Sequence, residues 1–278
     1  MKIFSSIKEF RAALDGCDAA GIGFVPTMGA LHAGHRSLVE RARRECRTVA
    51  VSVFVNPTQF NDKNDLKNYP RTPEADAALL EAAGADLVLM PSVEEIYPQA
   101  DTRQFDFGLI DKVMEGASRP GHFNGVGQVV SRLFDIVRPA KAYFGEKDFQ
   151  QIAVIRSLVS QLNLNIEIVE CPIVRESDGL ALSSRNTLLT PQHRAAAPRI
   201  YEVLSQCPSL SQRMTPAELE AYVTAAVNEN PLLEVIYFSA VDALTMQQVA
   251  DWSDAPRIQG CIAVRAGQIR LIDNIRIR

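Results

Sequence analysis

Short apolar runs alternate with helical patterns through residues 21 to 169, and this alternation limits the possible folds more than any other feature of the sequence. The run at 48–55 carries no charged side chain, which is typical of a strand buried on both faces of a parallel sheet. Alternating strands and helices predict an α/β fold with a doubly wound parallel sheet. Strands are expected at 21–26, 48–55, 86–90, 142–144 and 166–169, and helices around 38–46, 73–83, 126–137 and 152–162.

The pattern changes near Pro172. Beyond it, helices are expected at about 191–206 and 215–229, and strands near 233–241, 258–264 and 268–275. The last two strands are expected to form a hairpin across Ala266-Gly267. We interpret 1–172 as the first domain and 173–278 as a smaller α+β domain. The alternative is a single domain with a long C-terminal extension.

Composition excludes several classes of protein. Hydrophobic residues make up 47% and charged residues 22% of the 278 residues, which is globular rather than disordered usage. No apolar run approaches the roughly 18 residues of a membrane span, and the N-terminus lacks the apolar stretch of a signal peptide. A net charge of −4 without a basic block gives no indication of nucleic-acid binding. The five cysteines are scattered and form no CxxC pair, so a cytoplasmic protein is expected.

The most informative segment is Pro26-Thr27-Met28-Gly29-Ala30-Leu31-His32-Ala33-Gly34-His35, which follows the first strand and opens the first helix. A helix N-terminus attracts phosphate, and small residues let the backbone approach a ligand closely. His32 and His35 lie on one face of the first turn, where they could donate to phosphate oxygens. They could instead cap the helix; a metal pair lacks a recognisable third ligand. An HxGH sequence directly after a strand is a specific signal for nucleotide binding.

Polar side chains follow two further strands and should meet at the same edge of a parallel sheet. Lys147 could neutralise phosphate charge, and Asp148 could bind ribose hydroxyls or cap the next helix. Gln59 and Gln151 are suited to holding a hydroxy acid by hydrogen bonds, although both could be ordinary surface glutamines. The Ser-Ser-Arg-Asn run at 183–186 offers two hydroxyls and a guanidinium to a polyphosphate.

The loop that contains this run could close over the site and exclude water. Its other interpretation is a polar turn before a helix that starts at Pro191, with Thr190 as the N-cap.

Six segments together resemble the pantoate–β-alanine ligase family (pantothenate synthetases), which belongs to the HxGH nucleotidyltransferases. These segments are PTMGALHAGH (26–35), FVNPTQF (54–60), YPRT (69–72), RPGHFNGV (119–126), FGEKDFQQ (144–151) and DGLALSSRN (178–186). The resemblance implies a Rossmann-like first domain, a C-terminal lid and a homodimer. It also implies a two-step reaction in which ATP converts pantoate into pantoyl adenylate and pyrophosphate. The amine of β-alanine then displaces AMP to give pantothenate, the precursor of coenzyme A.

The resemblance also assigns residues. It implies catalytic roles for His32, His35, Lys147 and Arg185. Gln59 and Gln151 are implied to bind pantoate, and Gln59 also β-alanine. Magnesium (Mg2+) is expected on the ATP phosphates, with Asp76 as a carboxylate on its side. The implied ATP-binding residues are Met28, Gly29, Ala30, Leu31, His32, Ala33, Gly34, His35, Gly145, Glu146, Lys147, Asp148, Val174, Leu182, Ser183, Ser184 and Arg185.

Three residues of the RPGHFNGV segment, Arg119, His122 and Asn124, receive no role from the sequence. Two alternatives to the ligase are a nucleotidyltransferase that stops after transferring AMP or CMP, and a nucleotide-binding sensor without turnover. The paired glutamines argue against the first alternative. The retention of His32, His35, Lys147 and Arg185 argues against the second.

Overall fold

The computed structural model describes residues 1–278 and divides into two compact units. Unit 1 comprises Met1–Phe107, Arg119–Gly145 and Val154–Pro172. Unit 2 comprises Gly108–Ser118, Glu146–Ala153 and Ile173–Arg278. The last change of unit falls between Pro172 and Ile173, but two earlier segments also belong to unit 2. The expected domains, 1–172 and 173–278, stay a prediction.

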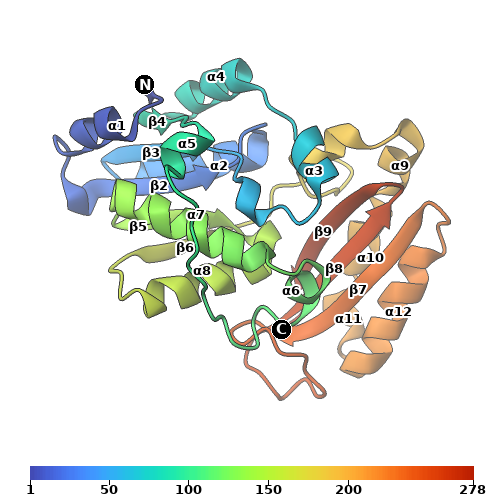
Figure 1. Cartoon of the computed structure of the whole chain (residues 1–278). Helices are drawn as coiled ribbons and strands as arrows, with labels where there is room; N and C mark the ends of the chain where they lie inside the picture. The colour runs from blue at the N-terminus through green and yellow to red at the C-terminus, as the bar shows by residue number, and fades with distance from the viewer. The chain divides into compact units, whose positions relative to one another are not determined.

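Unit 1 contains the doubly wound parallel sheet, which confirms the predicted fold class (Figure 1). All five predicted strands are present, and a sixth, β1, was not predicted. β1 has only three residues at the edge of the sheet, too few to show a period of two. The strands run in the order β1-β4-β3-β2-β5-β6. Their bounds are β1 Lys2–Phe4, β2 Ile22–Thr27, β3 Thr48–Val53, β4 Leu87–Leu89, β5 Lys141–Gly145 and β6 Glu167–Cys171.

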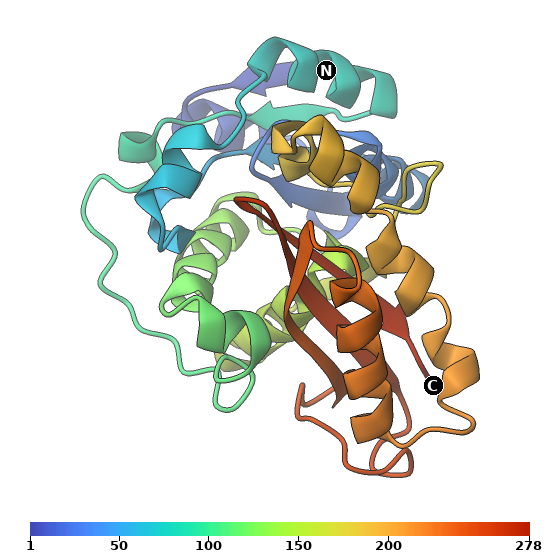
Figure 2. The ribbon, with the colours of Figure 1, turned by 90° about the vertical axis from the view of Figure 1, so that its right-hand side faces the viewer.

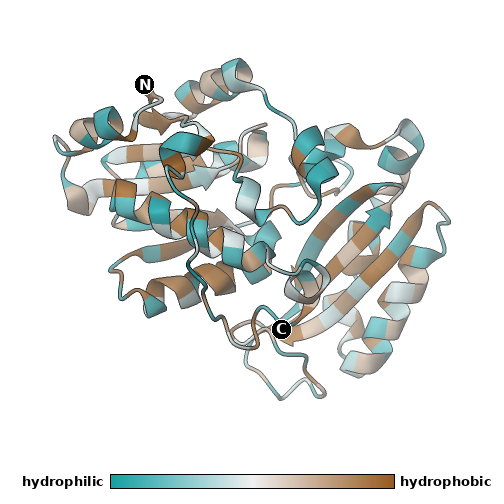
Figure 3. Cartoon of the chain, viewed as in Figure 1, coloured by the Kyte–Doolittle hydropathy of each residue, from teal (hydrophilic) through white to brown (hydrophobic).

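Helices cover both faces of this sheet. Leu38 and Leu80 join strand residues such as Val51 in a cluster on one face. On the opposite face Phe24 meets Phe134 edge to face, with ring centroids 6.3 Å apart. Figure 3 shows the matching pattern, with mostly apolar strands and helices that are apolar along one side. The helices are α1 Ile7–Leu14, α2 Ala33–Glu45, α3 Lys63–Asn68, α4 Pro73–Ala83, α5 Val93–Ile96, α7 His122–Val137 and α8 Phe149–Gln161, with short 3-10 turns η1 Ala19–Gly21 and η2 Pro57–Gln59. The first five residues of α8 belong to unit 2.

The strand order changes direction between β2 and β5, which pair in parallel. Ligands of open α/β sheets bind at such a switch point, outside the carboxyl ends of the strands. β2 ends at Thr27 and β5 at Gly145, so the loops that leave these two strands begin side by side. Both loops carry predicted site residues.

Unit 2 is built on an antiparallel sheet of three strands, with α10 and α12 packed along one face (Figure 2). Met114 and Phe149 join Val241 and Cys261 in a second cluster of the unit. The predicted hairpin is confirmed, and Gly267 in its turn has a φ of +63°. The elements are α6 Met114–Ser118, η3 Glu146–Asp148, η4 Ser184–Leu188, α9 Pro191–Ala196, α10 Arg199–Leu204, α11 Cys207–Leu210, α12 Pro216–Asn228, β7 Leu233–Asp242, β8 Ile258–Ala266 and β9 Ile269–Arg276.

One expected helix of unit 2 is wrong in its extent. The helix expected at about 191–206 is divided into α9 and α10, with Pro198 as the N-cap of α10. Proline has no N–H to donate and its ring collides with the carbonyl four residues earlier, so a continuous helix breaks here. None of the helices is both long and apolar enough to span a membrane.

Candidate active site

The loop after β2 is held by a buried carboxylate. Asp76 of α4 is 2% exposed and accepts hydrogen bonds from Ala30 N (3.0 Å), Leu31 N (2.8 Å) and the Thr72 hydroxyl (3.0 Å). Gly29 has a φ of +84°, and a Cβ there would lie 3.0 Å from Asp76 Oδ2. Asp76 therefore fixes the loop and occupies the N–H groups of Ala30 and Leu31, two residues that the family resemblance implies in ATP binding.

This bonding bears on the predicted metal role of Asp76. Both of its oxygens already accept hydrogen bonds, and no group of three or more His, Cys, Asp or Glu side chains could hold a metal ion. Mg2+ prefers accessible anionic oxygens and keeps several waters. Asp76 does not fit a direct magnesium ligand, and the geometry favours a role in bracing the loop. Its assignment to the metal stays a prediction.

The two histidines of the HxGH segment cap α2 through their Nδ1 atoms. His32 Nδ1 accepts from Gly34 N (3.1 Å), and His35 Nδ1 accepts from His32 N (3.3 Å). Because a neutral imidazole whose Nδ1 accepts carries its proton on Nε2, both rings have Nε2–H as their donor. The ring centroids lie 4.1 Å apart. Capping and donation to a ligand are therefore compatible, because they use different nitrogens.

The turn after β3 presents Gln59 and is held by a buried asparagine. Asn56, 1% exposed, donates to Gln59 Oε1 (3.2 Å) and to Gly125 O (3.0 Å). Its own oxygen accepts from the Tyr97 hydroxyl (2.9 Å). A Cβ on Gly125 would lie 2.3 Å from Thr58 O, so α7 packs against this turn only with glycine there. The amide of Gln59 is thus oriented with Nε2 toward Met28 Sδ (2.9 Å).

The RPGHFNGV segment supplies the rest of this support. His122 Nδ1 lies 2.7 Å from Gln59 O, and Arg119 lies 3.1 Å from His122 Nε2. Since a carbonyl only accepts, His122 carries its proton on Nδ1, and Arg119 donates to its Nε2. Asn124 accepts from Phe105 N and donates to Arg103 O, so it holds the 103–105 segment. Arg119 and His122 therefore support Gln59, and Asn124 supports the 103–105 segment.

A charged cluster lies next to this support. Asp101 receives hydrogen bonds from Arg103 and Arg132, and the Arg132 guanidinium lies 5.1 Å from the centre of the Tyr97 ring. The hydrogen bond from Arg103 is the main reason that the pKa of Asp101 is well below its usual range, and Arg132 adds to it. This cluster anchors the segment that follows Tyr97.

In unit 2, η3 carries Lys147, whose ammonium lies 3.5 Å from Asp148 Oδ1. Glu146 faces Arg257 at 3.7 Å. Gln151 is half-buried and has no hydrogen-bond partner within the chain, which suits a side chain kept for a ligand. Its neighbour Gln150 is buried and structural, since it bonds Glu115 N and two backbone carbonyls.

The segment 174–185 forms a tight hairpin that leads into η4. Leu182 N donates to Val174 O (3.0 Å), and Gly179 turns the chain with a φ of +92°. Ser183 caps η4 by accepting from Arg185 N (3.3 Å). Thr190 is the N-cap of α9, as the alternative interpretation of this loop expects. The Ser-Ser-Arg-Asn run thus forms its own turn, separate from the cap of the following helix.

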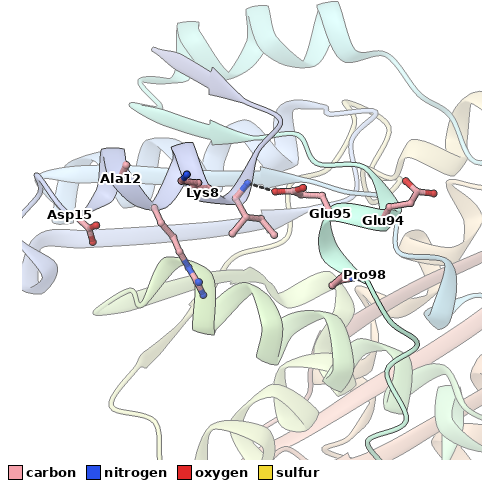
Figure 4. Close-up of a pocket in the computed structure, with 8 residues that line it drawn as sticks. Lys8, Ala12, Asp15, Glu94, Glu95 and Pro98 are labelled. Atoms are coloured by element: carbon pink, nitrogen blue, oxygen red, sulfur yellow. Dashed lines mark hydrogen bonds between the residues drawn. The ribbon is translucent and has the colours of Figure 1, made fainter.

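A surface groove of unit 1, with a volume of about 630 Å³, contains none of the predicted residues (Figure 4). It lies between α1 and α5, where Ile7 N donates to Glu95 Oε1 (2.7 Å). Lys8, Glu94 and Asp15 give it mixed charge. It offers no convergent set of groups for chemistry.

The parallel sheet with its switch point and the helix that begins with an HxGH segment after β2 are typical of the class of α/β proteins that bind ligands at the carboxyl ends of their strands. Within that class, the model of the family "Pantoate-beta-alanine ligase" matches residues 2–276, and the chain belongs to this family.

Relatives and solved structures agree with this membership. The chain is 56% identical to the pantothenate synthetase of Porphyromonas gingivalis, with 99% of each chain covered. It is 54% identical to that of Bacteroides thetaiotaomicron, with 100% of this chain and 99% of the other covered. The pantothenate synthetase of Thermus thermophilus superposes with a TM-score of 0.94 at 45% identity, covering 100% and 99%. A further structure is that of the pantoate-beta-alanine ligase of Francisella tularensis, complexed with beta-gamma ATP and beta-alanine. It superposes with a TM-score of 0.84 at 36% sequence identity, and the match covers 100% of this chain and 98% of the other.

Proposed function

We propose that this chain condenses pantoate with β-alanine at the expense of ATP, giving pantothenate, AMP and pyrophosphate. Family membership across the whole chain carries the proposal. The Francisella tularensis relative, whose structure holds an ATP compound and β-alanine, supports it.

The proposed reaction has two steps. A carboxylate oxygen of pantoate attacks the α-phosphorus of ATP, the bond to the bridging oxygen breaks, and pyrophosphate leaves. The amine of β-alanine then attacks the acyl carbon of pantoyl adenylate, AMP leaves, and the new amide loses a proton. Both steps depend on positioning and on stabilising charge, so no covalent nucleophile of the protein is required.

The proposed catalytic residues divide into donors and cations. His32 and His35 of unit 1 donate from Nε2 to phosphate oxygens, and the histidine caps support this by fixing the tautomers. Lys147 and Arg185 of unit 2 neutralise phosphate charge. ATP is bound by residues 28–35, 145–148, 174 and 182–185.

The proposed acid and amine sites rest on neutral amides. Gln59 and Gln151 bind pantoate, and Gln59 also contacts β-alanine. The fixed amide of Gln59 and the unpartnered side chain of Gln151 support these roles. Neutral amides hold a hydroxy acid without lowering the nucleophilicity of its carboxylate as strongly as a cation would.

Magnesium is proposed to enter with ATP, where it would neutralise charge on the phosphates. Such ions are usually held by phosphate oxygens and water with one or two carboxylates. Asp76 is engaged with the loop, so we assign no protein ligand to the ion.

We further propose a cytoplasmic homodimer. The five cysteines are free, which supports a reducing compartment. Light scattering of the purified protein tests the dimer, since a monomeric mass at micromolar concentration would contradict it.

The test of the proposed function is pantoate-dependent exchange of label between pyrophosphate and ATP, with and without β-alanine. We expect exchange with pantoate alone, and AMP and pantothenate once β-alanine is added. ATP binding without exchange would favour a nucleotide sensor. Exchange without AMP release on adding β-alanine would indicate a different amine acceptor.

A further inference from the structure

The last strand of unit 2 contains a buried asparagine that holds the turn bearing Lys147. Asn274 of β9 is 2% exposed, and its Nδ2 donates to Glu146 O (2.8 Å) and Lys147 O (3.0 Å). Its Oδ1 accepts from Gln259 Nε2 (2.7 Å). Since both carbonyls can only accept, the amide nitrogen must face them, and Gln259 must then donate to the oxygen. The orientation of the Asn274 amide is therefore fixed.

The neighbouring residue of the same strand holds the other proposed ATP-binding segment of unit 2. Asp273 receives two hydrogen bonds from Arg175, at 2.6 and 2.9 Å. Arg175 also donates to Gly179 O (3.1 Å), and its guanidinium stacks 3.7 Å from the centre of the Tyr201 ring. These contacts fix the hairpin that starts at Val174 and leads to residues 182–185.

Adjacent residues of a strand project to opposite faces of the sheet. Asp273 and Asn274 can therefore hold two different segments from one short stretch of β9. Neither segment is close to β9 in sequence, because Asn274 lies 128 and 127 residues from its two carbonyl partners and Asp273 lies 98 residues from Arg175.

We propose that Asp273 and Asn274 are positioning residues for ATP: Asn274 sets the backbone that presents Lys147, and Asp273 sets the hairpin that presents Val174. This inference rests on the proposed function, through the ATP-binding role of these segments. Neither residue is a catalytic residue, because each acts through another part of the chain. Displacement of a reacting group by about 1 Å can cost about 100-fold in rate.

A purely structural role makes a different prediction. If Asn274 only satisfied two buried carbonyls, its loss would lower the stability of unit 2 and affect all substrates alike. A positioning role instead predicts a selective effect on ATP.

Two variants and one control distinguish these roles. Asn274→Ala removes both hydrogen bonds to the η3 turn. Gln259→Ala keeps the Asn274 amide but removes the hydrogen bond that Gln259 donates to its oxygen. Val223→Ala is the control, since Val223 of α12 is fully buried in the helix–sheet core of unit 2 and its side chain can form no hydrogen bond to either segment. It loses stability by leaving a cavity. For each protein the melting temperature, the dissociation constant of MgATP by calorimetry, and the KM values of ATP and β-alanine are measured.

We expect Asn274→Ala to raise the dissociation constant and KM of ATP at least about tenfold, and Gln259→Ala about threefold, with the KM of β-alanine within about twofold. Val223→Ala should lower the melting temperature and leave ATP binding unchanged. Unchanged ATP binding in a folded Asn274→Ala protein overturns the proposal, as does an equal loss for both substrates. If Asn274→Ala does not fold, Gln259→Ala decides by the same criteria.

The wild-type protein separates this inference from the proposed function. A wild type that binds MgATP but makes no pantothenate refutes the proposed reaction. The ratio of the MgATP dissociation constant of each variant to that of the wild type then still decides the positioning role. A wild type that does not bind MgATP overturns both.

Discussion

Two short 3-10 turns carry proposed site residues, and both are held by a buried asparagine. In unit 1, Asn56 holds the η2 turn and Gln59, and it lies only three residues from Gln59. In unit 2, Asn274 holds the η3 turn and Lys147 from the far end of the sequence. The support has the same chemistry in both units, but only in unit 1 does it lie inside a recognisable sequence motif. Local support can be inferred from a motif, whereas remote support requires the fold.

The largest effect is expected when a proposed catalytic side chain is removed from either unit, His35 in unit 1 or Lys147 in unit 2. We expect His35→Ala and Lys147→Ala each to lower the rate of adenylate formation by about 100-fold or more, the scale of one preorganised charge-stabilising donor. Single-turnover measurements with ATP and pantoate give this rate. A change below about threefold in either variant would remove that residue from the proposed site.

The packing of the unit 1 turn is tested next. Gly125→Ala places a Cβ 2.3 Å from Thr58 O and 2.7 Å from Gln59 Cα, so the turn must move. We expect a loss of about 1–3 kcal/mol in the free energy of unfolding and a fall of at least about tenfold in kcat/KM for pantoate. Gly16→Ala is the control, because its Cβ would meet only Ala13 O at 3.7 Å. Equal behaviour of the two variants would contradict the tight packing.

The hydrogen bond from His122 is expected to have a smaller effect. His122→Ala should raise the KM of pantoate by about three- to tenfold, because the Gln59 carbonyl loses its donor. The KM of ATP should change by less than about twofold. His122→Asn offers an amide N–H near the position of Nδ1 and should recover most of the pantoate affinity. If His122→Asn behaves like His122→Ala, the hydrogen bond is not what matters.

Gln151 differs from Gln59 in having no partner within the chain. Gln151→Ala should therefore weaken pantoate binding by about two- to tenfold, the value of one neutral hydrogen bond, with little change in stability. Calorimetric titrations with pantoate and with MgATP measure the two affinities. Equal loss of both would move Gln151 out of the pantoate site.

The smallest effect on activity is expected at the outer edge of the unit 1 support. Arg103 and Arg132 lower the pKa of Asp101 in the folded protein. The stabilisation that ionised Asp101 gives to the folded state is therefore complete above the pKa of Asp101 in the unfolded chain, and it is lost as the pH falls toward the lower pKa of the folded state. Asp101→Asn should cost about 1–3 kcal/mol at pH 7, and the difference from wild type should shrink below about pH 4. Denaturant titrations at pH 7 and pH 3.5 measure it. A constant difference would contradict the role of the charge.

The sequence predicted much of the fold, because the central strands 22–27 and 48–53 carry no charged side chain and the helices show clear periodicity. The edge strand Lys2–Phe4 was missed because three residues carry no period. The motifs predict a set of nucleotide-binding residues, which stays a prediction, but they do not predict the residues that hold this set in place. The sequence predicts a metal-side carboxylate at Asp76, and it carries no sign of the hydrogen bonds from backbone N–H groups that Asp76 accepts in the structure. Asn274 gave no signal, because its partners are assembled only by folding.

The histidine cap of α2 also determines whether neutral or charged imidazole rings face a phosphate at the start of this helix. A second proton on either Nδ1 would turn an acceptor into a donor that faces a backbone N–H, so the imidazolium form would lose the cap bond. The capped helix end therefore presents neutral N–H donors rather than ions. Under the proposed function, the full positive charges of the protein come from Lys147 and Arg185, beside the magnesium that enters with ATP. The way in which α2 begins therefore separates two roles, since the histidines act as directional N–H donors and the cations neutralise charge.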